Sequence, residues 1–379
     1  MQTAPEADSS FVQTATSPAV ADDAAVAPRT TELARGTGTA TGAGNDLPNL
    51  DVLRAVAVSC VLGSHIVTAM RPIVINDNWF GGFGVALFFV HTALVLMWSL
   101  ERRPNTLDFY VRRAARIYPL SMVVVLAVVA THAPVETYHE GGSFFIYLSP
   151  SYKQVLTHFF LVQNLFSDNF LIYPMWSLPV EVQMYIVLPA LFFFVRSNQA
   201  RWPLLLFWGV AAGFDHHIFG PQIVNLAVSV PYFLPGVIAY AGFLLTRAVL
   251  PGWSFVLALA AITWIGGHAG TWDRAWIPCL ALGLLLPYFK QLRQGVFTKI
   301  CWQIARYSYG IYLLHPFALV LAFYVCRNSG RVVQFSVLFG SLAILSVAAF
   351  HLIEAPFMRR GAKVAAALAK RFPMAGAPC

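Results

Sequence analysis

The residues of greatest chemical interest are ionisable side chains that interrupt long apolar stretches. One stretch reads NLDVLRAVAVSCVLGSHIVTAM, and its Arg54 and His65 are eleven residues apart. On an α-helix this spacing places them within about 20° of one face and about 16 Å apart along the axis. Charged groups in hydrocarbon are costly and usually mark function. His65 is therefore a candidate general base or nucleophile.

Of the 17 acidic residues, Glu181 is the one that falls clearly inside an apolar stretch, in WSLPVEVQMY. Counting residues from the ends of the two stretches places Glu181 and His65 each about 8 Å below the same membrane surface. We therefore predict that the carboxylate orients the imidazole for proton transfer. A His–Glu pair that only holds two helices together is the alternative.

Two further arginines, Arg113 and Arg116, lie three residues apart in DFYVRRAARIYPL, on one helical face. Guanidinium groups bind phosphate well, although positive anchoring at a membrane surface explains these residues equally well. His315 precedes Pro316, where either a kinked packing site or the wall of a polar pocket is expected. His91 is interpreted as a hydrogen-bonded core histidine.

The composition identifies the environment of these residues. The 379-residue chain is 58% hydrophobic and 11% charged, against about 25% charged for an ordinary soluble domain. This excludes a water-soluble globule and predicts an integral membrane protein. The net charge of +8 is not gathered on one face or tail, so a nucleic-acid partner is not expected. Five scattered cysteines are interpreted as packing residues, and no metal site is expected.

The fold predicted is all-α, with about ten transmembrane helices. Residues 1–46 are poor in large apolar side chains and are expected to form a disordered tail. The spans follow from apolar runs long enough to cross hydrocarbon. They are predicted near residues 50–70, 80–99, 117–132, 176–195, 202–218, 224–246, 253–270, 275–289, 308–326 and 332–354.

The orientation follows from the basic residues between the spans. With the N-terminal tail in the cytoplasm, cytoplasmic segments receive 17 Lys and Arg residues and outside segments receive five. Basic loops stay inside, so both termini are predicted to be cytoplasmic. The long outside connection from Ala133 to Met175 carries apolar residues at helical spacing from Tyr152 to Phe160. A short helix on the membrane surface is favoured there over a re-entrant segment.

Several motifs in order make residues 48–358 resemble the membrane-bound acyltransferase 3 family. They are LDVLRAVAVSCVLGSH, GVALFFV, RRAARIYPL, WSLPVEVQMY, YSYGIYLLHP and IEAPF. The resemblance implies an essential role for His65, with Glu181 as its catalytic partner. It also implies that Arg54, Arg113 and Arg116 bind the acyl donor. The expected organisation is a tail over residues 1–46, the acyltransferase domain over 47–358 and a basic cytoplasmic tail over 359–379.

The family acylates cell-surface polysaccharides, lipo-oligosaccharides and some secreted small molecules. The resemblance therefore implies an O-acyltransferase of the bacterial inner membrane. It would move an acyl group, by family habit acetyl, from cytoplasmic acyl-CoA to a hydroxyl of a cell-surface or exported glycan or glycolipid. The roughly 16 Å between Arg54 and His65 is comparable with the length of the pantetheine arm. Whether His65 acts as a general base or carries the acyl group transiently stays open.

Two departures from the family pattern and one rival function accompany this resemblance. Val182 stands where the family usually has a second acid, and His91 alters the motif of the second helix. The rival is a proton-coupled transporter or flippase of a glycolipid or organic anion, since buried His and Glu residues also suit proton coupling. Cleavage of acyl-CoA by the purified protein distinguishes the two functions.

Overall fold

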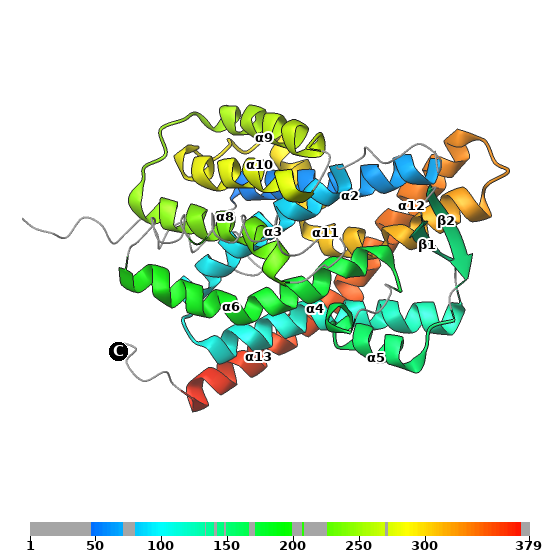
Figure 1. Ribbon diagram of the computed structural model, residues 1–379, viewed down its shortest axis with the longest axis horizontal. Helices are drawn as coiled ribbons and strands as arrows, with labels where there is room; N and C mark the ends of the chain where they lie inside the picture. The colour runs from blue at the N-terminus through cyan, green and yellow to red at the C-terminus, as the bar shows by residue number, and fades with distance from the viewer. Residues whose placement is uncertain are drawn as a thin grey trace, which may run out of the picture.

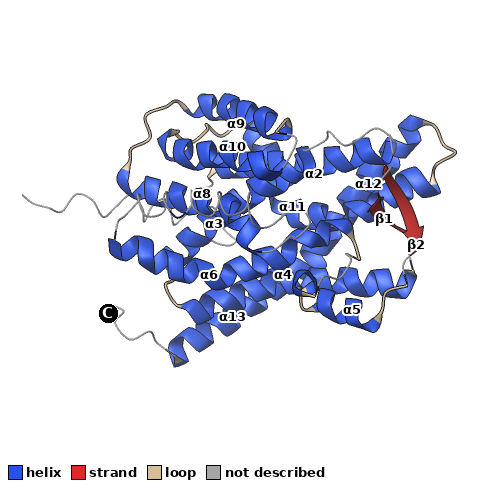
Figure 2. Ribbon diagram, viewed as in Figure 1, coloured by secondary structure: helices blue, strands red, loops and turns tan. Residues whose placement is uncertain are grey.

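The computed structural model describes residues 47–70, 80–132, 134–139, 142–147, 149–166, 171–198, 207, 226–269 and 272–372. These residues form a bundle of helices with one β-hairpin at its edge (Figures 1 and 2). The predicted tail over residues 1–46 and the predicted span over 202–218 lie outside the described residues, apart from position 207.

The helices follow the apolar stretches of the sequence. They are α2 (Pro48–Met70), α3 (Phe80–Arg102), α4 (Thr106–Thr131), α5 (Tyr152–Phe159), α6 (Ser177–Asn198), α8 (Leu226–Leu245), α9 (Gly252–Gly267), α10 (Trp272–Leu285), α11 (Val296–Leu319), α12 (Arg331–Ala349) and α13 (Ala355–Arg371). Short 3₁₀ segments are η1 (Gln163–Leu165), η2 (Tyr173–Trp176) and η3 (Leu286–Tyr288). Two π-helical segments, η4 (Val320–Val325) and η5 (Phe350–Glu354), follow α11 and α12.

Six of the described helices are long and apolar enough to cross a membrane. They run over Pro48–Met70, Phe80–Arg102, Thr106–Thr131, Tyr173–Arg196, Val296–Val325 and Arg331–Arg371. The predicted spans at 224–246, 253–270 and 275–289 coincide with the shorter apolar helices α8, α9 and α10. With its 16 residues, α9 covers about 24 Å of a hydrocarbon layer about 30 Å thick. The structure therefore supports a multi-pass membrane protein, and the count of ten spans stays a prediction.

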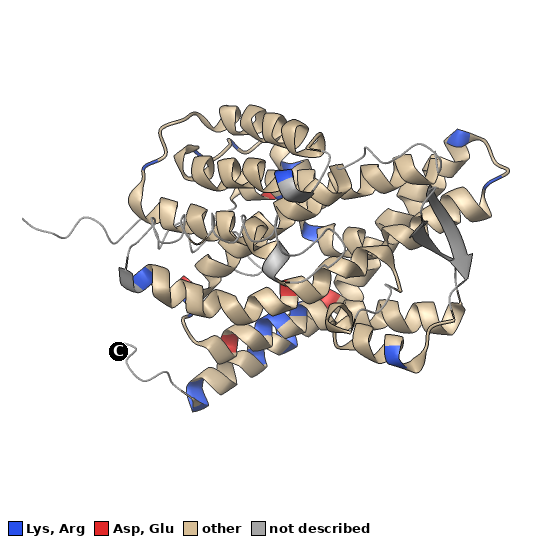
Figure 3. Cartoon of the chain, in the orientation of Figure 1, with Lys and Arg blue, Asp and Glu red and all other residues tan. Residues whose placement is uncertain are grey.

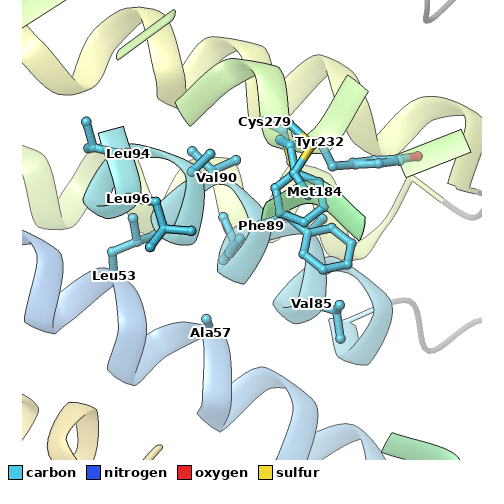
Figure 4. Packing of buried hydrophobic residues seen from close by; sticks show 14 of the residues in the cluster. Leu53, Ala57, Val85, Phe89, Val90, Leu94, Leu96, Met184, Tyr232 and Cys279 are labelled. Carbon is cyan, nitrogen blue, oxygen red and sulfur yellow. The ribbon is translucent and has the colours of Figure 1, made fainter. Parts of the chain in front are cut away.

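The core forms around α3, which packs against α2, α6, α8, α9 and α10. Figure 4 shows side chains of α3 such as Val85 and Phe89 between Ala57 of α2 and Tyr232 of α8. Small residues allow this close packing. A side chain at Gly236 of α8 would collide with the backbone of α3, so the two helices approach more closely than any larger residue permits.

The last helix lies alongside the first half of α4 (Figure 1). A Cβ atom at Gly361 would meet the Cβ of Ala115, so α13 and α4 are in direct backbone-level contact. Lys and Arg residues line α13 and the adjoining part of α4 (Figure 3). The side-chain Nδ2 of Asn105 also donates to the carbonyl of Phe372 at 3.2 Å. The segments predicted to lie on the cytoplasmic side therefore meet at one end of the bundle.

The long connection between α4 and α6 contains structure that periodicity did not reveal. Strands β1 (Pro134–His139) and β2 (Gly142–Tyr147) pair as an antiparallel hairpin. The expected short helix is confirmed as α5, which packs on α4. It begins with a capping box between Ser151 and Gln154. Because Tyr152 is 81% exposed and Phe160 57%, the outer face of this helix suits the membrane interface.

Candidate active site

A cavity with about 770 Å³ of empty space, part of it open to the outside, lies between five helices of the bundle. It contains four of the five site residues predicted from the sequence, Arg54, Arg113, Arg116 and Glu181. The other residues lining it are Val85, Phe88, Phe89, His91, Thr92, Val95, Leu96, Ile117, Ser177, Leu178, Tyr185, Ser308, Tyr309 and Tyr312. Three guanidinium groups and one carboxylate thus line a largely apolar cavity. The excess of positive charge favours an anionic ligand.

The positions of Arg113 and Arg116 follow from the helical register of α4. Three residues apart, they face the cavity together, as predicted. The adjacent Arg112 points elsewhere: its Nε donates to Asp108 at 2.8 Å and one Nη donates to the carbonyl of Ala362. Arg112 therefore holds α4 to α13, whereas its two neighbours line the cavity.

The cavity contains guanidinium donors that lack hydrogen-bond partners among the described residues. The Nε atoms of Arg54 and Arg113 are buried and unpartnered. Arg116 donates from Nη1 to the sulfur of Met358 at 3.1 Å, and sulfur is a weak acceptor. Buried charged donors without good acceptors are costly. The three arginines are thus poised to donate to a bound anion.

Arg54 is positioned by the anchored start of α2. The side chain of the buried Asn49 donates to the carbonyl of Lys290 at 3.0 Å and accepts from the amide of Leu292 at 3.0 Å. These bonds fix the first turn of α2 to the segment before α11. The helix then carries Arg54, one and a half turns further on, to the cavity.

Glu181 belongs to this arginine cluster. Its Oε1 accepts from the hydroxyl of Tyr185, one turn later on α6, at 2.6 Å. It interacts electrostatically with Arg116, Arg54 and Arg113. A second carboxylate, Glu354 at the end of η5, is 1% exposed, and both oxygens lack hydrogen-bond partners among the described residues. Glu354 interacts electrostatically with Arg116 and Arg54.

His65 lies outside the residues that line the cavity. It is buried, and its ring centroid is 4.8 Å from that of His315 and 5.2 Å from that of Tyr173. Tyr173 begins the 3₁₀ segment before α6, in which Pro174 to Trp176 are buried. From the level of Tyr173, Glu181 lies about 14 Å further along the chain, given the rises of 3₁₀ and α-helices. Glu181 is therefore deeper in the bundle than residue counting predicted.

Tyr312 links the two neighbourhoods. It lines the cavity, and its ring centroid is 6.4 Å from that of His315. Its hydroxyl donates to the carbonyl of Pro174 at 2.8 Å and is 2.6 Å from the hydroxyl of Ser177. The Tyr312–Ser177 pair thus stands between the arginines and His65.

Some site residues escaped sequence reasoning, although signals for them existed. His91 was expected both as a core histidine and as a residue that alters the second-helix motif, and it is buried and lines the cavity; it also interacts electrostatically with Arg54 and Arg116. Tyr185 follows Glu181 by four residues, which is the spacing of contacting helical side chains. Glu354 is the last residue of the predicted span over 332–354, but the helix continues to Arg371 through η5, and Glu354 is buried. Among the described residues, no group of three or more His, Cys, Asp or Glu side chains gathers as metal ligands do.

The fold and the cavity together describe a multi-pass membrane protein with a cluster of buried arginines, and sequence comparisons identify its family. The family model described as an acyltransferase domain, Acyl_transf_3, matches residues 47–353. The chain therefore belongs to this acyltransferase family. The match does not support the transporter alternative.

Two relatives are similar to part of the chain. The chain is 30% identical over 179 residues to acyltransferase MdmB of Streptomyces mycarofaciens, and this alignment covers 44% of the chain and 43% of the relative. The chain is also 30% identical over 177 residues to peptidoglycan O-acetyltransferase OatA of Listeria monocytogenes, and this alignment covers 42% of the chain and 26% of the relative. The alignments thus span less than half of either relative. No solved structure matches the chain significantly.

Proposed function

We propose that the protein is an integral membrane O-acyltransferase of the cytoplasmic membrane, with both termini in the cytoplasm. It moves an acyl group, acetyl in the first instance, from cytoplasmic acyl-CoA to a hydroxyl of a cell-surface or exported glycan or glycolipid. The single observation that carries this proposal is the cavity in which Arg54, Arg113 and Arg116 gather, where the Nε atoms of Arg54 and Arg113 have no hydrogen-bond partner among the described residues. The relative named as a peptidoglycan O-acetyltransferase supports a glycan-type acceptor.

The arginines suit the donor by their chemistry. The nucleotide part of acyl-CoA carries phosphates, and guanidinium groups form charge-assisted, often bidentate hydrogen bonds to phosphate. The buried Nε atoms of Arg54 and Arg113, which lack hydrogen-bond partners in the part of the chain that the structure describes, are donors that such an anion would satisfy. The cavity therefore suits the phosphates of acyl-CoA, which Arg54, Arg113 and Arg116 would hold. When bound, the donor supplies an acyl group activated as a thioester.

The residues proposed for the chemical step are His65 and Glu181. His65 takes the proton of the acceptor hydroxyl as general base, at the end of the bundle opposite the basic α13. In the overall reaction an ester C–O bond forms, the thioester C–S bond breaks, and the hydroxyl proton is returned to the departing thiol. The orienting role of Glu181 stays a proposal, since its described partners are Tyr185 and the arginines.

The proposal is tested with purified protein in detergent, radiolabelled acetyl-CoA and an envelope fraction from a strain that lacks the gene. We expect label to enter base-labile esters in that fraction, with release of one thiol for each ester formed. His65→Ala should abolish transfer while the protein still purifies as a folded species. Absence of acetyl-CoA cleavage by the wild-type protein with every envelope fraction would refute the proposal and favour a transport function.

A further inference from the structure

In helix α11, the tautomer of His315 is determined by the residue that follows it, Pro316. Pro316 lies inside the helix and has no N–H, so it cannot donate to the carbonyl of Tyr312 four residues earlier. That carbonyl accepts instead from His315, whose Nδ1 lies 2.8 Å away. Because a carbonyl oxygen can only accept, the hydrogen of the neutral imidazole is on Nδ1. The other ring nitrogen, Nε2, then carries a lone pair.

This lone pair is buried and available. His315 is 1% exposed, and its Nε2 has no hydrogen-bond partner among the described residues. His158 provides a contrast within the same protein. Its Nδ1 is likewise 2.7 Å from a backbone carbonyl, that of Gln154, but its Nε2 accepts from the amide of Leu171 at 3.0 Å. Both nitrogens of His158 serve the fold, whereas one nitrogen of His315 does not.

The ring of His65 lies beside the ring of His315. Their centroids are 4.8 Å apart with an interplanar angle of 49°. A hydrogen bond of about 2.9 Å between two ring nitrogens separates the centroids by roughly 5 Å. The two rings are therefore close enough to form an N–H···N hydrogen bond after a small adjustment. The two rings come from different helices, His315 from α11 and His65 from α2.

We propose that His315 is a positioning residue for acyl transfer, which orients His65 by accepting a hydrogen bond from it at Nε2. The inference rests on the proposed function. With one nitrogen of His65 donating to His315, the other nitrogen presents its lone pair to the acceptor hydroxyl. The proton of that hydroxyl moves to His65, and the resulting imidazolium donates more strongly to His315. The Tyr312 carbonyl, which Pro316 leaves without its helical N–H donor, thus sets the tautomer of His315 and, through it, the tautomer of His65.

Three substitutions separate the acceptor role of His315 from its packing. His315→Phe keeps a ring but has no acceptor, and His315→Asn keeps a donor for the Tyr312 carbonyl but does not reach the Nε2 position. His315→Gln extends an amide oxygen toward that position. We expect kcat to fall about 100-fold for the Phe and Asn variants and to stay within about tenfold of wild type for the Gln variant. Because His315 does not line the cavity, KM for acetyl-CoA should be unchanged in all three.

A substitution at Pro316 tests how the tautomer of His315 is set. Pro316→Ala restores an N–H that competes with His315 for the Tyr312 carbonyl, and it places a good helix former inside a helix. We expect kcat to fall while the melting temperature does not, so loss of folding cannot explain the result. In protein labelled with ¹⁵N-histidine, the wild type should give a signal for an unprotonated Nε2 that His315→Gln removes.

His268 supplies a matched control. Its Nδ1 lies 2.8 Å from the carbonyl of Trp264, but the residue is exposed and lies at the end of α9. His268→Phe and His268→Asn should leave kcat and KM unchanged. Wild-type kcat in His315→Asn, or a protonated Nε2 in the labelled protein, would overturn the inference and leave the acyltransferase proposal intact. Absence of transfer by the wild-type protein would instead refute the proposed function itself.

Discussion

Replacing Arg113 by Gln isolates the anion-binding role of the cavity. Arg113 lines the cavity with a buried Nε that lacks a partner among the described residues. A hydrogen bond to a charged group is worth about 1.5–3 kcal/mol, and about 1.4 kcal/mol corresponds to a tenfold change in affinity. Loss of one such bond to the donor should therefore raise its Kd by about 10- to 150-fold. Equilibrium binding of radiolabelled acetyl-CoA to the purified protein measures this change.

The neighbouring Arg112 provides the control. It carries the same charge on the same helix turn, but its guanidinium is bonded to Asp108 and to the carbonyl of Ala362. Arg112→Gln should leave the Kd for acetyl-CoA within a factor of two or three and should lower only the thermal stability. Equal loss of binding in the Arg112 and Arg113 variants would show that general positive charge attracts the donor. Unchanged binding in the Arg113 variant would refute the anion-site reasoning.

Three further predictions follow from the contacts. Glu181→Gln removes the carboxylate that is proposed to orient His65, so kcat should fall at least about tenfold. Because this carboxylate is also the negative charge beside the three cavity arginines, acetyl-CoA binding should not weaken, and weaker binding would contradict the prediction. Gly361→Ala brings a methyl group against Ala115 and should destabilise the fold by about 1–3 kcal/mol, whereas Gly340→Ala, which meets open space, should not lower the melting temperature. Tyr312→Phe removes the hydroxyl bonded to Pro174 and Ser177 and should cost about 1–3 kcal/mol in thermal unfolding; an unchanged melting temperature would refute the importance of this pair.

The parts of the site that follow from helical periodicity could be predicted from the sequence. Arg113 and Arg116 share a face because three residues separate them on α4, and both line the cavity. Arg54 lies on α2 as expected, and the apolar run that contains it forms one uninterrupted helix. These positions depend on local geometry, which residue spacing encodes.

The parts that depend on how segments enter the bundle could not be predicted. Glu181 was assigned the depth of His65 on the assumption that α6 starts at the membrane surface. Residues Tyr173 to Trp176 instead form a buried 3₁₀ turn beside His65, which carries Glu181 deeper toward the arginines. The ring of His65 also lies beside that of His315, and a contact between helices so distant in the sequence has no periodic signal.

The continuation of α12 was also missed, for a physical reason. The apolar run ends near Glu354, where the sequence changes to basic residues, and a span boundary is expected at such a change. The helix nevertheless continues through η5 and α13, because Gly361 and Ala365 form a small-residue face against α4. This continuation buries Glu354 beside the arginines.

The most direct test of the central claim is ester analysis of envelope glycans in a strain that lacks the gene and is complemented with variants. The wild-type gene and His268→Ala should restore the base-labile esters lost on deletion. His65→Ala, at equal membrane abundance and with unchanged acetyl-CoA binding, should restore none of them. Wild-type ester content in the His65→Ala strain would contradict the account.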